Sequence, residues 1–345
     1  MLWFVGLGLS GAESISSETE KLLKDADTVY LELFTSPISE SHITKIKEIV
    51  KGEFKLAKRW MVEDGKEILE AAQKNNVVIL TYGDPFIATT HIELRTRAIQ
   101  SKITTKTIHA SSAITALVGE CGLHYYKVGK VVTIMDDTKT LTTPYYSIYQ
   151  NEIAGLHTIL LLEFNQDAKF FLDPATALSN LLGAEKGQKR NVISPSTFAV
   201  IASRIGFKDQ NIVAGKISSL LNQSFGEPPH SIIIPGKLHF TEVDALKVLA
   251  NCLDIPDENI NNIKKISKQM LEKYVPMVKT ALEEIAPHYK NSKEFQSVLE
   301  NAALYIQDAE KFLEEGKDEV AILSIGYADG LVDALRIAKG IEPKM

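Results

Sequence analysis

Apolar and polar positions alternate between two different patterns along the first third of the chain. Short apolar runs predict strands, and between them apolar positions recur every three or four residues, which predicts helices. This alternation is typical of a parallel sheet with crossover helices, so we expect an α/β domain over residues 1–112. The expected strands are 2–7, 28–34, 54–57, 77–81 and 106–109, with helices such as 18–26 and 67–74 between them.

A second α/β series follows and predicts another domain over residues 113–255. Its expected strands are 130–135, 157–164, 197–203 and 230–234. Helical patterns fall near 145–154, 175–182 and 217–222, and 241–253 is typical of a closing helix.

The pattern changes near Asp254, where the polar stretch IPDENINN begins just after it. Beyond it, three apolar stripes at helical spacing predict an all-α, three-helix appendage over residues 256–345, with Gly316 as a stop between the last two helices. The stripes are Ile263, Ile266, Met270, Tyr274, Met277, Ala281 and Ile285; Phe295, Val298, Ala302, Tyr305, Ala309 and Phe312; and Val320, Leu323, Tyr327, Leu331 and Leu335.

Composition narrows the class of protein. The 345 residues are 45% hydrophobic and carry a net charge of −6. The hydrophobic content is enough for a buried core. The net negative charge does not indicate a basic face, so we expect no direct nucleic-acid binding. Cys121 and Cys252 are too few for a disulfide framework or a cysteine-rich zinc site. The lack of a basic leader and of a long apolar run predicts a cytoplasmic protein without a membrane span.

The stretch FVGLGLSGAES contains Gly6, Gly8 and Gly11 in the Gly-x-Gly-x-x-Gly spacing of a dinucleotide site, after an apolar strand. In such a site the next helix begins inside the motif. Here a capping box from Ser17 to Glu20 predicts a later start. Three interpretations therefore stay open: a dinucleotide site, a loop for another small molecule, and a plain turn.

A second loop, LTYGDPFIATTH, follows the most apolar strand of the first domain. It places Asp84 at the tip of a tight turn, at the strand end where open α/β sheets bind ligands. The carboxylate could accept hydrogen bonds from a ribose or an amine, or it could simply cap the turn or the next helix.

Together these loops resemble the tetrapyrrole methylase superfamily, whose members bind S-adenosylmethionine between two α/β domains. The narrower resemblance is to the members that methylate translation elongation factor 2. Eight segments carry it in order: FVGLGL, ELFTS, GDPFIATTH, IHASS, GLHYYKVGK, GLHTILLLE, FGEPPHSIIIPGKLH and EVDAL. The tail, residues 256–345, resembles a small archaeal helical domain of unknown function.

The resemblance implies a set of cofactor contacts, most of them apolar or through the backbone. Two positions depart from the family pattern: Tyr82 stands where a proline often precedes the turn, and Ile205 is bulkier than the usual alanine. The implied cofactor-binding residues are Leu9, Asp84, Ile87, Ser112, Ala113, Leu162, Ile205 and His230.

The resemblance also implies the reaction and the partners. The acceptor is the amino group of a 3-amino-3-carboxypropyl arm on a histidine of translation elongation factor 2, the other product is S-adenosylhomocysteine, and the enzyme is a homodimer without a metal. The alternatives are a methylase with a tetrapyrrole or ribosomal RNA acceptor, a non-catalytic binding module, and a nicotinamide oxidoreductase.

No general base can be identified from the sequence. His91, His124 and His230 are candidates, although each is more often a packing or hydrogen-bonding residue. Tyr125 and Tyr126 could face a quaternary ammonium product, but core packing is the favoured interpretation.

Overall fold

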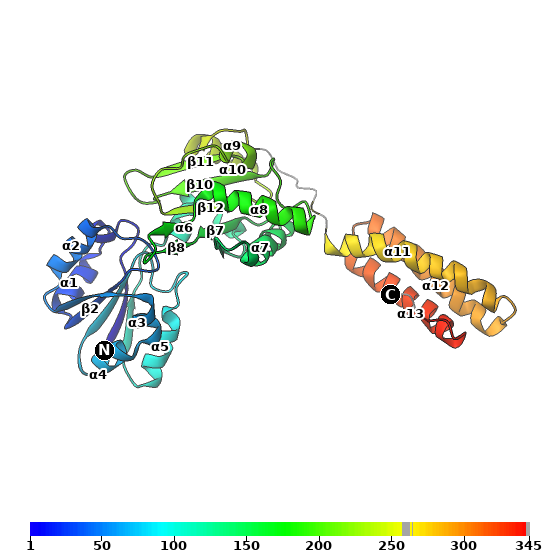
Figure 1. Ribbon diagram of the computed structural model, residues 1–345, viewed down its shortest axis with the longest axis horizontal. Coiled ribbons are helices and arrows are strands. Elements are labelled where there is room, and N and C mark those ends of the chain that lie inside the picture. Colours follow the sequence, from blue (N-terminus) through cyan, green and yellow to red (C-terminus); the bar gives the residue numbers. More distant parts are fainter. Residues whose placement is uncertain (257–262, 264, 343–345) are drawn as a thin grey trace. The chain divides into compact units, whose positions relative to one another are not determined.

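The computed structural model of the chain describes residues 1–256, 263 and 265–342. Contacts divide the chain into two units, residues 1–261 and 262–345 (Figure 1). Among the described residues, the first unit contains a five-stranded sheet, a six-stranded sheet and a two-stranded hairpin with their helices, and the second contains helices. No helix among the described residues is long and apolar enough to cross a membrane.

The first sheet has five parallel strands in the order β3-β2-β4-β1-β5, as the alternating pattern predicted. Residues of β1, β2 and β4 are buried almost throughout, and separate apolar clusters cover the two faces of the sheet. The strands are β1 (Leu2–Gly6), β2 (Thr28–Glu32), β3 (Glu53–Ala57), β4 (Val77–Thr81) and β5 (Thr105–Ile108). The helices are α1 (Ser17–Asp25), α2 (Glu40–Ile49), α3 (Arg59–Asp64), α4 (Lys66–Lys74) and α5 (His91–Gln100).

Helix α1 begins six positions after Gly11, which confirms the late start, but the predicted capping box is wrong. The N-cap is Ser16, whose hydroxyl accepts a hydrogen bond from the backbone N–H of Thr19 at 3.0 Å. Ser17 already has helical geometry. Adjacent serines offer two cap positions, and sequence spacing alone does not choose between them.

The second sheet has six strands of mixed direction, in the order β13-β11-β10-β12-β7-β6. Strand β10 runs antiparallel to β11 and β12, and β12 runs antiparallel to β7. The strands are β6 (Val132–Ile134), β7 (Thr158–Leu162), β10 (Phe198–Ser203), β11 (Asn211–Lys216), β12 (His230–Ile234) and β13 (Asn251–Cys252), beside a hairpin of β8 (Phe164–Asn165) and β9 (Phe170–Phe171). The helices are α6 (Ala113–Glu120), α7 (Thr142–Ile153), α8 (Pro174–Gln188), α9 (Ile217–Leu220) and α10 (Phe240–Leu249).

Two expectations for this domain need correction. The closing helix ends at Leu249, because Asn251 and Cys252 pair with β11 as strand β13. Strand β11 was not predicted from the sequence. It contains a glycine, Gly215, which lowers its strand signal, yet it is buried beside β10.

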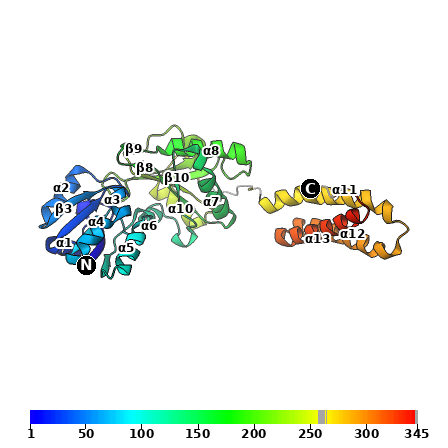
Figure 2. The same cartoon turned by 60° about the horizontal axis from the view of Figure 1, so that its bottom comes forward.

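The described part of the second unit contains three α-helices, α11 (Ile266–Ile285), α12 (Lys293–Glu314) and α13 (Asp318–Ala338), with the short 3-10 helix η4 (Ala286–Tyr289) after α11 (Figure 2). The helices share one apolar core. Gly316 has φ +72° between α12 and α13, so it is the predicted stop.

The stripe predicted for α13 is largely wrong. Val320, Leu323 and Tyr327 are exposed, whereas Ala321 and Ala328 are fully buried in the core. Small side chains let helices approach closely, so here the alanines face the neighbouring helices. Hydrophobicity alone therefore selected the wrong face of this helix.

Candidate functional site

The carboxyl ends of β4, β1 and β5 meet at one edge of the first sheet, because the three strands are adjacent and parallel. The glycine loop after β1 and the loop after β4 are joined there by two backbone hydrogen bonds between Gly8 and Gly83. Both glycines have positive φ, +73° and +77°, which explains the residue type at each position. The first glycine loop is thus a fixed part of this edge.

Tyr82, which departs from the family pattern, has a structural role. Its hydroxyl donates a hydrogen bond to the carbonyl of Leu9 at 2.6 Å, and its ring stacks on Phe207. Burial raises the pKa of Tyr82, so the phenol stays protonated and remains a donor. The Ser10 hydroxyl donates to the carbonyl of Gly206, which ties the same loop to the second domain.

Asp84 is buried at the junction of two loops. One carboxylate oxygen accepts from the N–H of Phe86 at 2.9 Å, as a turn cap would. The other accepts from His109 Nδ1 at 2.8 Å and from the N–H of Ala110 at 3.2 Å. Asp84 therefore both caps its own turn and holds the segment after β5 against the loop after β4.

One pocket in the first unit is lined by loops of both α/β domains, and we call it the first pocket. The sequence expectation named Leu9, Asp84, Ile87, Ser112, Ala113, Leu162, Ile205 and His230, and all eight line it. Tyr82 and the hairpin residues Phe164 and Phe171 line it as well. Its walls are thus mainly apolar, with a few polar groups at strand and helix ends.

Ser112 and Ile205 show how the local fold forms these walls. Ser112 is the N-cap of α6, and its hydroxyl accepts from the N–H of Ile114 at 3.3 Å. Ile205 is buried against the core of the second domain despite its bulk, and the following Gly206 has φ +86°. A Cβ at Gly206 would lie 2.5 Å from the Cβ of Leu9, so glycine permits this close approach.

A second pocket adjoins the first and shares six lining residues with it: Thr35, Ala88, Leu161, Leu162, Glu163 and Phe164. It differs in charge, because Lys58, Arg59, Glu163 and Asp167 all line it. The junction contains Ala88 with φ +56°, an uncommon backbone conformation for a residue with a side chain.

Only one of the three candidate histidines lines either pocket. His230 lines the first pocket, where its Nε2 donates to the carbonyl of Gly226 at 3.1 Å and burial lowers its pKa. His91 is fully buried; its Nδ1 donates to the carbonyl of Pro85 at 2.9 Å, which is a structural role. His124 lies in a separate cluster described below.

The favoured interpretation of the two neighbouring tyrosines is wrong. Tyr125 is 57% exposed and Tyr126 is 99% exposed, on the 3-10 helix η2 (Tyr125–Lys127), so neither packs in the core. Neither lines the two pockets, and a contact with a cationic product there is not supported. Sequence reasoning took aromatic residues as buried, although this short turn lies at the surface.

Glu32 is an important residue whose environment the sequence did not reveal. It ends β2 and is almost completely buried; Oε2 accepts from the N–H groups of Phe34 and Thr35 at 3.0 Å each. Oε1 is buried without a hydrogen-bond partner. Burial raises the pKa of Glu32 to about 7, although these hydrogen bonds and the charge of Arg59 oppose the increase. Phe34 and Thr35 line the second pocket directly after it.

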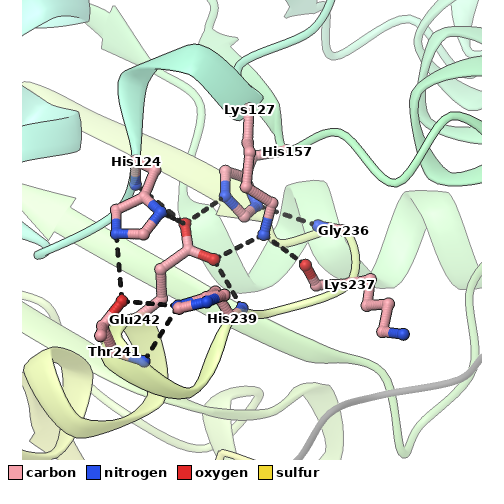
Figure 3. Close-up of polar contacts among 8 residues, drawn as sticks. All are labelled: His124, Lys127, His157, Gly236, Lys237, His239, Thr241 and Glu242. Atoms are coloured by element: carbon pink, nitrogen blue, oxygen red, sulfur yellow. Dashed lines mark hydrogen bonds and ion pairs between the residues drawn. The ribbon is translucent and has the colours of Figure 1, made fainter.

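A buried ionic cluster surrounds Glu242 on α10 (Figure 3). Its carboxylate accepts from the N–H groups of His124 and His239, from His157 Nε2 at 2.8 Å, and from Lys127 Nζ at 2.5 Å. His157 Nδ1 accepts from the N–H of Gly236 at 3.1 Å, so Nε2 carries the proton. Burial lowers the pKa of His157, which keeps the ring neutral. The cluster joins three segments distant in sequence.

No group of three or more histidine, cysteine, aspartate or glutamate side chains in the described part of the chain is arranged to hold a metal ion.

The fold and the pocket agree with comparisons to known proteins. Residues 1–221 match the family model for Tetrapyrrole (Corrin/Porphyrin) Methylases. The chain therefore belongs to the tetrapyrrole methylases, which confirms the resemblance, and the dinucleotide hypothesis for the glycine loop is set aside. Residues 273–341 match a second family, Protein of unknown function (DUF357).

Individual relatives show to which group of tetrapyrrole methylases the chain belongs. The chain is 38% identical to the diphthine synthase of Methanocaldococcus jannaschii over 254 residues, 72% of this chain and 98% of the relative. It is 34% identical to that of Methanothermobacter thermautotrophicus, over 72% of this chain and 96% of the relative. A crystal structure of diphthine synthase matches with a TM-score of 0.66 and 30% identity, covering 73% of this chain and 96% of the other. Within the tetrapyrrole methylases, the chain thus belongs to the diphthine synthases.

Proposed function

We propose that this protein transfers methyl groups from S-adenosylmethionine to the amino group of the 3-amino-3-carboxypropyl arm on a histidine of translation elongation factor 2, forming diphthine in diphthamide biosynthesis. The observation that carries the proposal is the first pocket: all eight residues expected to bind the cofactor, from both α/β domains, line it. Membership of the diphthine synthases supports the choice of acceptor. Transfer of labelled methyl groups to the factor bearing the arm tests it.

The character of the first pocket suits this methyl donor. Apolar side chains such as Leu9, Ile87 and Leu162 offer surface to an adenine ring, while Asp84 and Ser112 supply polar groups at its edge. The bound donor supplies an electrophilic methyl group on a sulfonium. The task left to the protein is to align the attacking amine with that methyl and to exclude water.

Replacing Asp84 with alanine is expected to weaken S-adenosylmethionine binding by roughly 1–3 kcal/mol, the usual cost of losing a buried hydrogen-bonding group. The carboxylate holds Phe86, His109 and Ala110, so the loop after β4 and the segment after β5, both of which lead into the pocket lining, lose these contacts. Isothermal titration calorimetry measures the change.

The exposed Asp244 on α10 provides the matched control for that substitution. Asp244→Ala should bind the cofactor like the unaltered chain. A folded Asp84→Ala protein with unaltered affinity would exclude Asp84 from the cofactor site.

We also propose that the protein is a cytoplasmic homodimer. Five exposed apolar side chains fall between residues 240 and 255, on and after α10, and a second copy of the chain would cover them. They are Phe240, Val248, Leu249, Leu253 and Ile255. Light scattering at micromolar concentration should give the mass of two chains, and Val248→Asp should lower it. The mass of one chain for the unaltered protein would contradict the dimer.

A further inference from the structure

The acceptor arm proposed above ends in an amino acid: one carbon carries both the amine that is methylated and a carboxylate. An enzyme that aligns this amine must hold the carboxylate beside it, because the two groups are attached to the same atom. The cation that holds it must therefore lie in a space that opens onto the first pocket. The second pocket meets that condition, since six lining residues are common to both.

Two cations line the second pocket, and their surroundings differ. Lys58 Nζ lies 3.0 Å from Asp167 Oδ1, so that ammonium already has a carboxylate partner within the pocket lining. Arg59 contacts Glu63 of its own helix at 3.4 Å, and Glu63 is not among the lining residues. Of these two cations, Arg59 is therefore the one whose carboxylate partner does not line the pocket.

Stacking fixes the Arg59 guanidinium without using its hydrogen-bond donors. Its Cζ lies 4.9 Å from the centre of the Phe34 ring. A cation held over an aromatic face keeps its N–H groups at the edge of the guanidinium plane, where they can meet a carboxylate in two parallel hydrogen bonds. Phe34 in turn follows the buried Glu32, whose carboxylate holds the N–H groups of Phe34 and Thr35.

The opposite charge lies in the wall common to the two pockets. Glu163 lines both, and its Oε2 accepts from the N–H of Asp136 at 2.8 Å, which fixes the side chain. Its negative charge suits an ammonium group and the quaternary ammonium that repeated methylation leaves. The lining thus presents a cation in the second pocket and an anion at the junction, the pattern required by a zwitterionic amino-acid end.

We propose that Arg59 binds the carboxylate of the acceptor arm in the second pocket and so presents the amine to the methyl donor in the first. This inference rests on the proposed function and adds a residue that selects acceptors ending in a free amino acid. Arg59 is a positioning residue, since it holds the acceptor without exchanging protons or methyl groups with it.

The test compares Arg59→Gln, Arg59→Lys and the unaltered full-length chain, with Arg95→Gln as the control. Arg95 is another arginine of the first domain stacked on a phenylalanine, Phe86, at 5.1 Å, but it lines neither pocket. Arg59→Gln should lower kcat/KM for elongation factor 2 bearing the arm by about 10- to 100-fold. S-adenosylmethionine affinity and the melting temperature should stay unchanged. Arg59→Lys should recover part of the loss, because it keeps the charge without the planar fork.

A binding measurement separates this inference from the proposed function. With S-adenosylhomocysteine present, the unaltered chain should prefer elongation factor 2 bearing the arm over the unmodified factor, and Arg59→Gln should lose that preference. If Arg59→Gln keeps the preference or the kcat/KM of the unaltered chain, or if Arg95→Gln loses as much, the role of Arg59 is wrong. If the unaltered chain prefers the factor bearing the arm but transfers no methyl group to it, only the proposed function is contradicted. If it shows neither the preference nor methyl transfer, the proposed function and the role of Arg59 are both contradicted.

Discussion

Replacing Glu242 with alanine is expected to lower the free energy of unfolding of the first unit by about 3–5 kcal/mol, the cost of removing one partner from a buried charge cluster. Glu242 is fully buried and accepts four hydrogen bonds, from Lys127, His157 and the N–H groups of His124 and His239. Burial alone would raise the pKa of this carboxyl, yet the hydrogen bonds lower it to about 2. The native state therefore strongly favours the charged form. Alanine leaves His157 and the N–H groups of His124 and His239 without this acceptor, while Lys127 keeps only the carbonyl of Lys237.

Urea unfolding followed by circular dichroism measures this loss, with Asp244→Ala on the same helix as the exposed control. The lowered pKa also predicts that the stabilisation from Glu242 is present above about pH 4.5 and is lost as the pH falls toward 2. A Glu242→Ala protein within about 1 kcal/mol of the unaltered chain would show that the cluster is not a source of stability.

The second large effect concerns pH and Glu32. Its pKa is raised to about 7, so the native state holds a proton there that the unfolded chain releases near pH 4.5. Stability from this group is therefore fully present below pH 4.5 and is lost as the pH rises through 7. The displacement corresponds to about 3 kcal/mol at most. Glu32→Gln removes the titration, so its stability relative to the unaltered chain should improve by up to about 3 kcal/mol between pH 5 and pH 8.

Tryptophan fluorescence suits this measurement, because Trp3 and Trp60 are the two tryptophans of the chain and both lie in the first α/β domain. Glu67→Gln is the control: that carboxylate bonds to Tyr30 and Lys55 at the surface of the same domain, and its pKa is lowered instead of raised. Parallel stability curves for Glu32→Gln and the unaltered chain would contradict a raised pKa at Glu32.

The strand pattern predicted the first sheet, and the geometry of parallel strands explains why three of the residues that the resemblance implied lie close together. Parallel strands bring their carboxyl ends to one edge, so loops after β1, β4 and β5 must meet once the strands are recognised. Leu9, Asp84 and Ser112 lie in or directly after those loops and share one pocket. Cofactor binding by these residues stays a prediction.

The errors arise where burial depends on neighbours that are distant in the sequence. Leu323 and Tyr327 match a helical stripe, but helix packing buries alanines on another face of α13. Tyr125 and Tyr126 are aromatic, yet their short turn lies at the surface. Local pattern does not contain this tertiary information.

The environments of buried polar residues were harder still to predict from the sequence. Glu32 lies within the expected strand 28–34, and nothing local indicates that one of its oxygens is buried without a partner. Glu242 had a usable signal, since it stands three residues after His239 at the start of α10, where the structure has a capping box. Its side-chain hydrogen-bond partners Lys127 and His157 lie more than eighty residues away in the chain.

Mass spectrometry of translation elongation factor 2 tests the central claim most directly. The factor bearing the unmethylated arm is incubated with this protein and S-adenosylmethionine, and the peptide carrying the modified histidine is then fragmented. The proposed function predicts one or more added methyl groups on the amino group of the arm, dependent on both the protein and the methyl donor. An unchanged peptide, or methylation at another residue, would contradict the assignment of this chain as the enzyme that forms diphthine.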